Sequence, residues 1–332
     1  MTEDPARLDA PGRSEAPSEK ERIAVIGGGM MGQACSQAFA MAGFEVRLQS
    51  LGDELFRGVR DRIRSDLAFI AERGLGSPDR VDETVARVHT TSDLAEAVDG
   101  ADFVLECIFE DLEAKRTLFR EMEALVGSEV ILATNTSVIR VTEIAEACES
   151  PGRVVGAHWW TPAYLMPIVE IIAGEETTRD TVDRATHLMK DAGKIPLYVK
   201  KDAPGFVGNR LLHCLYREAM YIVDQGIADL ETVDLMLKYG PGARFQVMAP
   251  FEHMDMVGLD LDCAVESYLW PHLADTHEVF PMLTDKVAKG ELGFKSGGVG
   301  FRTWTPEQQK AFRENLLDHL ARQAAAGAFK ER

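Results

Sequence analysis

The stretch GAHWWTPAYLMPIVE contains one histidine, His158, and ends in one carboxylate, Glu170, with no charged residue between them. If its two halves form strands that pair antiparallel about Tyr164, His158 lies opposite Glu170, with Cβ atoms about 5 Å apart on one face. A carboxylate at that distance accepts the imidazole N–H and fixes the tautomer. The other ring nitrogen is then available as a general base, and this pair suits the oxidation of an alcohol. A histidine bound to a buried acid for packing alone would give the same pattern, so the stretch by itself leaves both roles open.

A glycine-rich turn near the N-terminus forms the second group of residues with a specific chemistry. Gly27, Gly29 and Gly32 stand in G-x-G-x-x-G spacing between an apolar run at 23–26 and a helical pattern at 33–41. The first glycine permits a tight turn, the second lets the backbone approach a pyrophosphate, and the third lets helix and strand pack closely. The pyrophosphate then lies on free N–H groups at the helix N-terminus. Because the motif joins a strand to a helix, it predicts dinucleotide binding.

The next strand pattern, at 45–49, ends without the acidic residue that usually binds the adenosine ribose of NAD. Gln49 and Ser50 occupy this region, and the first acid is Asp53. Arg47 lies within the strand, so no arginine is evident for the 2′-phosphate of NADP either. We therefore expect NAD as the cofactor, with NADP not excluded.

A basic stripe follows on the predicted helix 53–72. Arg57, Arg60 and Arg64 stand at i, i+3 and i+7, which places them on one face. In so acidic a protein, such a stripe could hold a phosphate-bearing substrate. It could equally be a solvated face paired with neighbouring acids such as Asp61.

The order of the remaining patterns predicts an α/β fold in two domains. Further apolar strand patterns lie at 103–108, 130–134, 154–158, 168–172 and 197–199, with helical patterns between several of them. This alternation is typical of a Rossmann-type, doubly wound, mostly parallel sheet. Helical patterns alone then follow at 206–225, 229–238, 250–270 and 275–290. We therefore expect a disordered leader at 1–21, a dinucleotide-binding domain at 22–201 and an all-helical substrate and dimerisation domain at 202–332.

The overall composition restricts the partners. The chain has 332 residues and a formal net charge of −18, which opposes binding to nucleic acid and to anionic membranes. An anionic ligand must therefore be held by local positive groups. The five cysteines show neither metal-site spacing nor a disulfide framework, and no apolar run is long enough to span a membrane. We expect a reduced, cytoplasmic protein without a bound metal.

Seven motifs together resemble the L-3-hydroxyacyl-CoA dehydrogenase family, including its branch that acts on small hydroxy acids: L-gulonate and carnitine dehydrogenases and lambda-crystallin. The resemblance extends from about residue 22 to about residue 305. The motifs are IAVIGGGMMG, VLECIFEDLEAK, ATNTS, GAHWWTP through MPIVE, DAPGFVGNRLL, APFEHMDMVGLD and GFKSGGVGF.

The resemblance implies roles for individual residues. It implies that His158 is the general base and Glu170 its orienting partner, with Ser137 and Asn209 as polar groups that bind or position the substrate. The residues that it places near the cofactor are Gly27, Gly29, Met30, Met31, Gly32, Ser50, Glu110, Lys115 and Asn135. Thr161 replaces the asparagine usual in the family, which leaves the chain length and head group of the substrate open.

The leading hypothesis is an NAD(P)-dependent oxidoreductase that interconverts a 3-hydroxy and a 3-oxo carboxyl compound. By resemblance, the default substrate is a short-chain 3-hydroxyacyl-CoA such as 3-hydroxybutyryl-CoA, as in fatty acid metabolism, with Arg57, Arg60 and Arg64 as candidates for the CoA phosphates. The alternative is a free small hydroxy acid or a polar alcohol, which the bulky WW and AYLM segments favour. A minor alternative is a non-catalytic, crystallin-like structural protein. The apolar residues of YREAMYIVDQGI also predict a homodimer.

Overall fold

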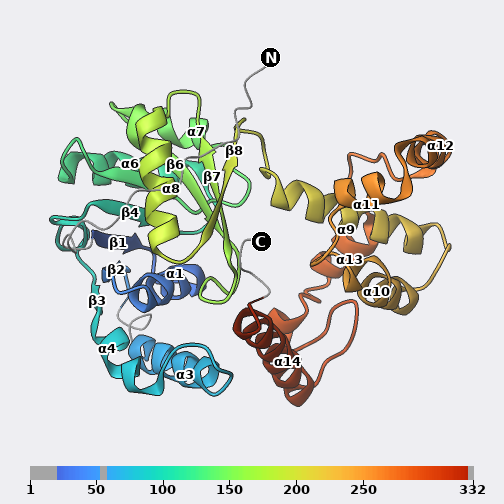
Figure 1. Cartoon of the computed structure of the whole chain (residues 1–332), viewed down its shortest axis with the longest axis horizontal. Coiled ribbons are helices and arrows are strands. Elements are labelled where there is room, and N and C mark those ends of the chain that lie inside the picture. The colour runs from blue at the N-terminus through green and yellow to red at the C-terminus, as the bar shows by residue number, and fades with distance from the viewer. Residues whose placement is uncertain (1–20, 53–57, 328–332) are drawn as a thin grey trace.

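The computed structural model describes residues 21–52 and 58–327, so Arg57 and nearly all of the predicted leader lie outside the described part. An eight-stranded sheet in the order β3-β2-β1-β4-β5-β6-β7-β8 forms the centre of the first domain (Figure 1). All neighbouring strands are parallel except β6 and β7. The strands are β1 (Arg22–Ile26), β2 (Glu45–Gln49), β3 (Val88–Thr91), β4 (Phe103–Glu106), β5 (Ile131–Thr134), β6 (Val154–Trp159), β7 (Ile168–Ala173) and β8 (Ile195–Val199).

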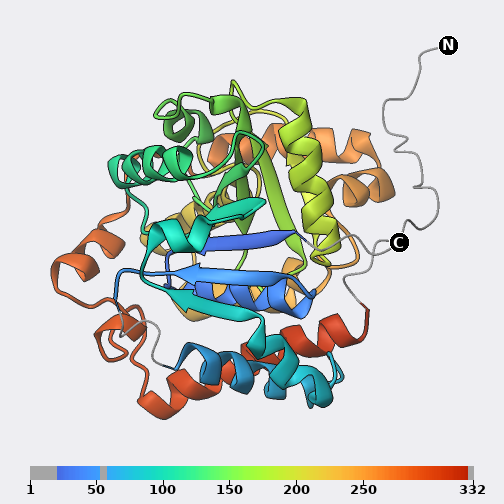
Figure 2. The ribbon, with the colours of Figure 1, turned by 90° about the vertical axis from the view of Figure 1, so that its left-hand side faces the viewer.

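Helices cover both faces of this sheet (Figure 2). Along β1, Ile23 and Val25 pack into one apolar cluster and Ala24 and Ile26 into the other, as expected for a strand buried on both sides. One cluster includes α1 (Met30–Met41), α3 (Val59–Ala71), α4 (Val81–Ala86) and α8 (Arg179–Asp191). The opposite cluster includes α5 (Leu94–Val98), α6 (Leu112–Leu125) and α7 (Val141–Ala145).

The second part of the chain is helical. It comprises α9 (Gly208–Asp224), α10 (Leu230–Tyr239), α11 (Pro250–Val257), α12 (Leu259–Leu269), α13 (Pro281–Ala288) and α14 (Pro306–Ala325). The predicted fold class, a Rossmann-type sheet followed by a helical domain, is therefore confirmed. The predicted helix 250–270 is two helices, because Gly258 adopts a φ of 104° between them. The predicted helix 275–290 begins only at Pro281.

The turn between β6 and β7 is fixed by Lys194. Its Nζ donates hydrogen bonds to the carbonyls of Ala163 and Met166, at 2.6 and 3.0 Å, and lies 5.4 Å from the centre of the Trp159 ring. Burial lowers the pKa of Lys194 to about 8. This contact holds the turn that joins the strand of His158 to the strand of Glu170.

The connection from β8 to α9 is anchored by Asp202. This buried carboxylate accepts hydrogen bonds from the backbone N–H of Val141 and from both the N–H and the hydroxyl of Thr142. It therefore caps α7 from a distant part of the chain, and it fixes the segment that leads into α9.

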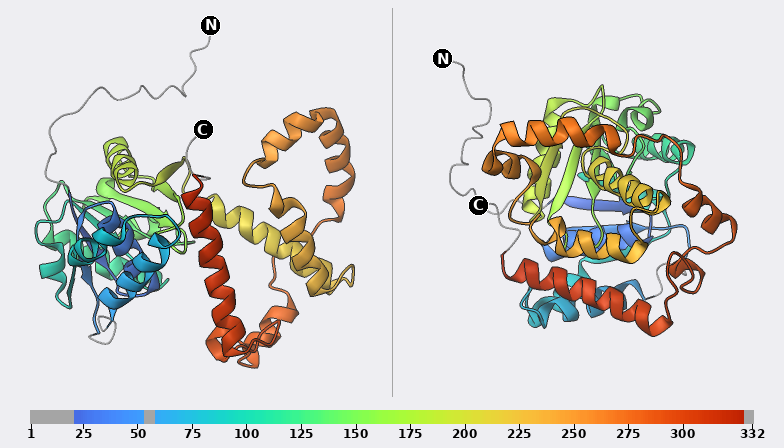
Figure 3. Two further views of the ribbon diagram at one scale, coloured as in Figure 1. Left: turned by 60° about the horizontal axis from the view of Figure 1, so that its bottom comes forward. Right: turned by 90° about the vertical axis from the view of Figure 1, so that its right-hand side faces the viewer.

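Helix α14 returns from the helical part to the first domain (Figure 3). Its Ala321 is fully buried, and Leu317 and Leu320 pack against the apolar cluster that includes α3. Arg73, just after α3, donates from Nε to Asp318 of α14 at 2.8 Å. By contrast, no residue of helices α9 to α13, all within the described chain, is buried.

None of the helices within residues 21–52 and 58–327 combines the length and apolar composition that a membrane crossing requires. In the same part of the chain, no three histidine, cysteine or acidic side chains are grouped so that they could hold a metal ion.

Candidate active site

His158 and Glu170 face each other across the antiparallel pair β6–β7, in the register predicted from the sequence. The Nδ1 of His158 lies 2.7 Å from Oε2 of Glu170, and both side chains are buried. Because an ionised carboxylate can only accept, Nδ1 carries the proton and Nε2 is the free acceptor. The second carboxylate oxygen, Oε1, accepts the backbone N–H groups of Val207 and Gly208, both at 3.0 Å. Glu170 therefore ties the histidine to the start of α9.

These contacts determine the ionisation of Glu170. Burial alone would raise its pKa, but the hydrogen bonds from His158 and from the backbone of Gly208 and Val207 outweigh burial and hold the pKa below its usual value. The carboxylate is consequently charged wherever the fold is intact near neutral pH.

Two aromatic rings hold the imidazole in place. The ring centres of Trp160 and Phe206 lie 5.5 and 5.8 Å from that of His158. Phe206 is buried and adopts a φ of 51°, a strained conformation for so bulky a residue. Trp160 lies over Gly208, where a Cβ atom would stand 2.3 Å from Cζ2 of the indole. The glycine is therefore required by this close approach.

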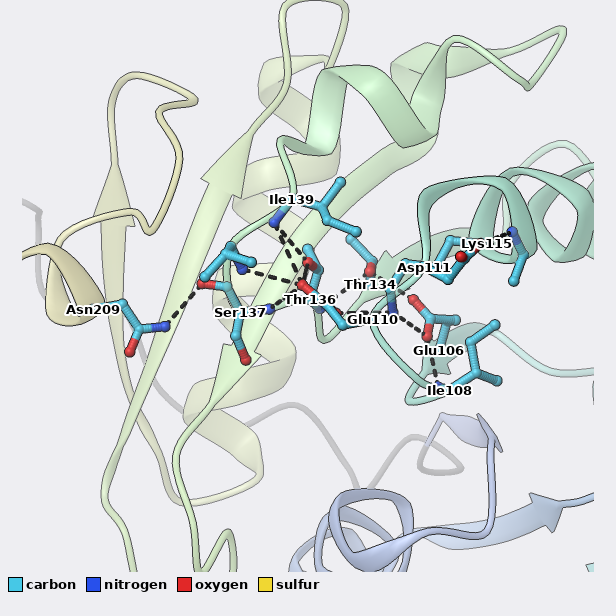
Figure 4. A network of polar contacts seen from close by, with 12 residues as sticks. Glu106, Ile108, Glu110, Asp111, Lys115, Thr134, Thr136, Ser137, Ile139 and Asn209 are labelled. Carbon is cyan, nitrogen blue, oxygen red and sulfur yellow. Dashed lines mark hydrogen bonds and ion pairs between the residues drawn. The ribbon is translucent and has the colours of Figure 1, made fainter. Parts of the chain in front are cut away.

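Ser137 and Asn209 come together from different domains (Figure 4). The Nδ2 of Asn209, on the first turn of α9, donates to the carbonyl oxygen of Ser137 at 2.9 Å. Asn135, two residues before Ser137, accepts the N–H of Trp159 on its side-chain oxygen at 2.8 Å. These bonds place the Ser137 loop beside His158 and beside the N-terminus of α9.

Glu110 holds the Ser137 loop from the side opposite Asn209 (Figure 4). Its Oε1 accepts the Thr136 hydroxyl and the backbone N–H groups of Ser137 and Val138, the latter two at 3.1 and 3.2 Å. Burial would raise the pKa of Glu110, but these donors and Lys115 together lower it. The contacts of Glu110 position the Ser137 loop.

Lys115 lies beneath the site and does not line its wall. It is 1% exposed, and its Nζ is 2.7 Å from Oε1 of Glu106, a side chain with no exposure, and 3.5 Å from Oε2 of Glu110. Glu106 also accepts the Thr134 hydroxyl and the N–H of Ile108, both at 2.7 Å. Burial raises the pKa of Glu106, against the opposing effect of Lys115. Lys115 therefore reaches the site only through Glu106 and Glu110.

The glycine turn has the geometry that a dinucleotide needs. Gly27 has a φ of 114°, and a Cβ there would lie 2.7 Å from the backbone of Cys107. A Cβ at Gly32 would lie 1.8 Å from the carbonyl oxygen of Gly27, whereas nothing lies within 4 Å of a Cβ at Gly29. Helix α1 begins at Met30, so its first N–H groups face this open side. The turn fits the pyrophosphate of NAD.

Met30 and Met31 occupy different environments. Met30 is 71% exposed, whereas Met31 lines the cavity that contains His158. The hydroxyl of Thr161 donates to the sulfur of Met31 at 3.0 Å. This bond joins the first turn of α1 to the segment after β6.

Ser50 is buried at the end of β2, and its N–H donates to the carbonyl of Thr91 at 3.2 Å. The amide of Gln49 donates to the carbonyl of Ser92 at 3.2 Å. Both residues thus attach the end of β2 to β3, and Asp53 lies outside the described residues.

The two described arginines of the predicted stripe bind groups outside the cavity. Arg64 pairs with Asp61 and Asp82, each at 3.2 Å. Arg60 donates to the carbonyl of Val88 at 3.1 and 3.3 Å. Neither lines the cavity of His158. These contacts match the solvated-face interpretation of the stripe.

Arg62 lies between Arg60 and Arg64 in the sequence but had no predicted role. Its Nε donates to Oε1 of Gln33 at 2.9 Å, and Gln33 in turn donates to the carbonyl of Gly28. Helical spacing places Arg62 on a different face from the stripe, but it does not show which face contacts α1.

A cavity of about 500 Å³ brings the site together. His158, Ser137, Asn209 and Glu110 all line it, from β6, the loop after β5, α9 and the loop after β4. Asn135, Met31 and Thr161 line it too. Six further lining residues had no role predicted for them individually from the sequence: Cys107, Ile108, Val138, Trp159, Trp160 and His213. His213 stands four residues after Asn209, and this spacing on one helix face was the signal that could have identified it.

Two family models match consecutive parts of the chain. The model described as the NAD-binding domain of 3-hydroxyacyl-CoA dehydrogenase matches residues 22–203. The model described as the C-terminal domain of the same enzyme matches residues 205–304. Helix α14 lies beyond both matched ranges.

Individual relatives carry different substrate names. A 5-formyl-3-hydroxy-2-methylpyridine 4-carboxylate 5-dehydrogenase from Mesorhizobium japonicum is 35% identical over 291 residues, which are 88% of this chain and 93% of the relative. A probable 3-hydroxybutyryl-CoA dehydrogenase from Bacillus subtilis is 35% identical over 84% of this chain and 96% of the relative. Among solved structures, a 5-formyl-3-hydroxy-2-methylpyridine 4-carboxylic acid 5-dehydrogenase, described as an NAD+-dependent dismutase, superposes with a TM-score of 0.86. It is 34% identical and covers 92% of this chain and 99% of its own.

Proposed function

Because the chain belongs to the 3-hydroxyacyl-CoA dehydrogenase family of NAD-dependent oxidoreductases, we propose that it interconverts a 3-hydroxy and a 3-oxo carboxyl compound. The observation that carries this proposal is the 2.7 Å contact between Nδ1 of His158 and Glu170. It leaves Nε2 of a buried, oriented imidazole as the proton acceptor in the cavity.

In the oxidising direction, Nε2 of His158 removes the proton of the substrate hydroxyl. The charged Glu170 stabilises the imidazolium that forms, and it keeps the ring in one tautomer. The glycine turn at residues 27–32 would hold NAD, and the nicotinamide would supply the hydride acceptor for the carbon that bears this hydroxyl. In the reverse direction, the imidazolium returns the proton to the oxygen.

Ser137 and Asn209 supply the polar groups for the substrate oxygen. A hydroxyl and an amide bind both an alcohol and a developing carbonyl without changing their own charge. Asn209 already bonds to the backbone of Ser137 at 2.9 Å, so the two groups come to the substrate as one unit. Glu110 supports this unit through the loop N–H groups.

We place a free small hydroxy acid ahead of an acyl-CoA as the substrate. The sequence alone favours the acyl-CoA, with the arginine stripe as the phosphate site. Arg60 and Arg64 are engaged elsewhere, so among the described residues of the stripe nothing supports that site. The relative from Mesorhizobium japonicum is named for a small carboxylate. A short-chain 3-hydroxyacyl-CoA remains the second candidate, because the relative from Bacillus subtilis carries that name.

We also propose that the protein is a cytoplasmic homodimer joined through its helical domain. Large apolar side chains are exposed along that domain, including Phe251, Tyr268 and Trp270 at 82%, 77% and 65%. Surface of this kind is typical of an interface between subunits. The five cysteines, all free, fit a reducing compartment.

A dehydrogenase assay tests the proposed function. Purified protein is supplied with NAD and a panel of free acids: 3-hydroxybutyrate, gulonate, carnitine and a hydroxymethyl-pyridine carboxylate. In parallel, it is supplied with NADH and acetoacetyl-CoA. We expect turnover with at least one free acid and little with the CoA ester. Turnover with acetoacetyl-CoA alone would establish the second candidate substrate. Turnover with neither kind of substrate would favour the crystallin-like alternative. The presence of all four predicted catalytic residues argues against that alternative: His158, Glu170, Ser137 and Asn209.

His158→Ala identifies the base in the same assay. We expect turnover to fall by roughly 10²- to 10⁴-fold, the usual contribution of a general base, with the affinity for NADH unchanged. The matched control is His187→Ala, because His187 lies on α8 and is 79% exposed. Turnover of His158→Ala near the wild-type value would remove His158 from the mechanism.

A further inference from the structure

We propose that His213 binds the carboxylate of the substrate, and this inference rests on the proposed function. His213 lies on α9, lines the same cavity as His158, and is exposed. Its ring contacts Tyr216 of the same helix, with ring centres 5.4 Å apart. We place His213 at the exposed rim of the cavity as a residue that determines substrate specificity. The buried His158, by contrast, is the proposed proton acceptor.

The position of His213 on α9 matches the shape of a hydroxy acid. Four residues separate it from Asn209, so both side chains project from one face, about 6 Å apart along the helix axis. In a 3-hydroxy acid, the carboxylate carbon is two bonds from the carbon that is oxidised. A substrate whose oxygen is held by Asn209 and Ser137 can therefore extend its carboxylate along α9 towards His213.

The charged and basic side chains around the cavity indicate that His213 is the residue that binds the substrate carboxylate. Among the described lining residues, His158 and His213 are the only basic side chains. His158 is bound to Glu170 and faces the reacting hydroxyl. The other charged lining residue, Glu110, is an anion whose Oε1 is occupied by donors of the Ser137 loop. With a net charge of −18 opposing an anionic ligand, the remaining imidazole is the local donor that the carboxylate needs.

The rest of the wall suits a small substrate. Trp160 is fixed against Gly208, and Met31 is fixed by Thr161, so two bulky side chains are held in the cavity wall. These side chains make apolar contact with the substrate, whereas the polar groups of the cavity determine its orientation. A thioester has no negative charge at the corresponding carbon, so His213 would discriminate in favour of the free acid.

The test compares a carboxylate with its neutral ester in matched variants. The probes are the best free acid of the panel described above and the methyl ester of that acid. For His213→Leu, we expect KM for the free acid to rise by roughly 10- to 100-fold, the usual range for a lost charge-assisted hydrogen bond, with little change in kcat. The KM for the ester should stay within about twofold. His213→Gln retains an N–H donor, so it should recover part of the affinity for the acid.

The controls distinguish the inference from the proposed function and from misfolding. His187→Leu replaces an exposed histidine that does not line the cavity, and it should match wild type with both probes. The affinity for NADH should be unchanged in all three variants. An equal rise in KM for acid and ester, or no rise for either, would overturn the role of His213 while leaving the dehydrogenase intact. A wild-type protein that turns over none of the free acids would overturn the free acid as the proposed substrate, and this inference with it.

Discussion

Lys115 connects the sheet to the Ser137 loop through two carboxylates. It is buried with Glu106 at the end of β4, and it also lies 3.5 Å from Glu110, which carries the Ser137 loop. A buried ion pair is weak evidence for stability, because desolvation offsets the attraction. The ion pair of Lys115 and Glu106 instead fixes the orientation of Glu110. Its effect on the free energy of unfolding becomes large only when one partner is removed.

We therefore expect Lys115→Met to lower the free energy of unfolding by about 3–5 kcal/mol, because Glu106 is left as an uncompensated buried charge. The double variant Glu106→Gln with Lys115→Met should recover a large part of this loss. Denaturant unfolding of the wild type, both single variants and the double variant measures the coupling. Additive losses would contradict a direct interaction between the two side chains.

Glu110 and Glu170 should make the fold sensitive to acid. Their folded-state pKa values are lowered from the ordinary value of 4.5. Their contribution to stability is therefore fully present above pH 4.5 and is lost as the pH falls from there through the lowered values. Glu110→Gln should be less stable near neutral pH and should lose less stability on acidification. Melting temperatures over a pH series check this, and parallel curves for variant and wild type would refute it.

At the residue scale, the sequence was informative where a pairing rule applied. The symmetric placement of His158 and Glu170 about Tyr164 predicted their register, because strand pairing depends only on spacing. Arg62 and His213 were missed because their importance depends on which face of a helix meets α1 or the cavity. Lys115 was assigned near the cofactor, and only tertiary contacts reveal that it is enclosed by Glu106.

At the scale of elements, the joint between β8 and α9 is the most constrained part of the site. Glu170 binds the N–H groups of Val207 and Gly208, and Trp160 lies over Gly208. The start of α9 is thus fixed by the same carboxylate that orients His158. The addition of one methyl group at this joint should therefore lower turnover.

We expect Gly208→Ala to reduce turnover at least tenfold, because the new Cβ would lie 2.3 Å from Cζ2 of Trp160 and would displace the indole from His158. Trp160→Phe in the same chain removes the clashing ring and should restore part of the activity. Gly127→Ala is the control, because nothing lies within 4 Å of a Cβ at that position. Wild-type kinetics for Gly208→Ala would show that the joint tolerates movement.

Three elements were missed from the sequence, each for its own physical reason. Strand β3 is short, and its burial is limited to Val88 and the partly buried Thr91, so it lacks an apolar run. Helix α12 was merged with α11, because a glycine inside an apolar pattern does not reveal its φ in advance. Helix α14 carries few apolar residues, and its buried face is defined by α3, far away in the sequence.

At the scale of the whole molecule, the two domains differ in how many of their residues are buried. The sheet domain has two apolar clusters, whereas helices α9 to α13 have no buried residue within the described chain. A helix gains most of its stability from packing one face against a neighbour. The helical domain therefore needs a second surface, and a second copy of the chain is the partner that we propose.

We expect light scattering after size exclusion to give twice the mass of one chain, and the melting temperature to rise with protein concentration. Leu269→Glu, on the helical domain, should weaken the dimer. Leu125→Glu, on α6 of the sheet domain, has a similar initial exposure of 46% against 42% and should not. A mass of one chain at all concentrations would exclude this arrangement.

Helix α14 closes the helical domain back onto the sheet domain. At one end, the domain is attached through the segment anchored by Asp202 and through the contacts of Glu170 at the start of α9. At the other end, α14 packs on α3. The segment from α9 to α14 is therefore a loop with both ends attached to the same sheet domain, and it does not hang from a single linker. Asn209 and His213 follow the first attachment directly, whereas α12 lies at the far end of the helical domain (Figure 1).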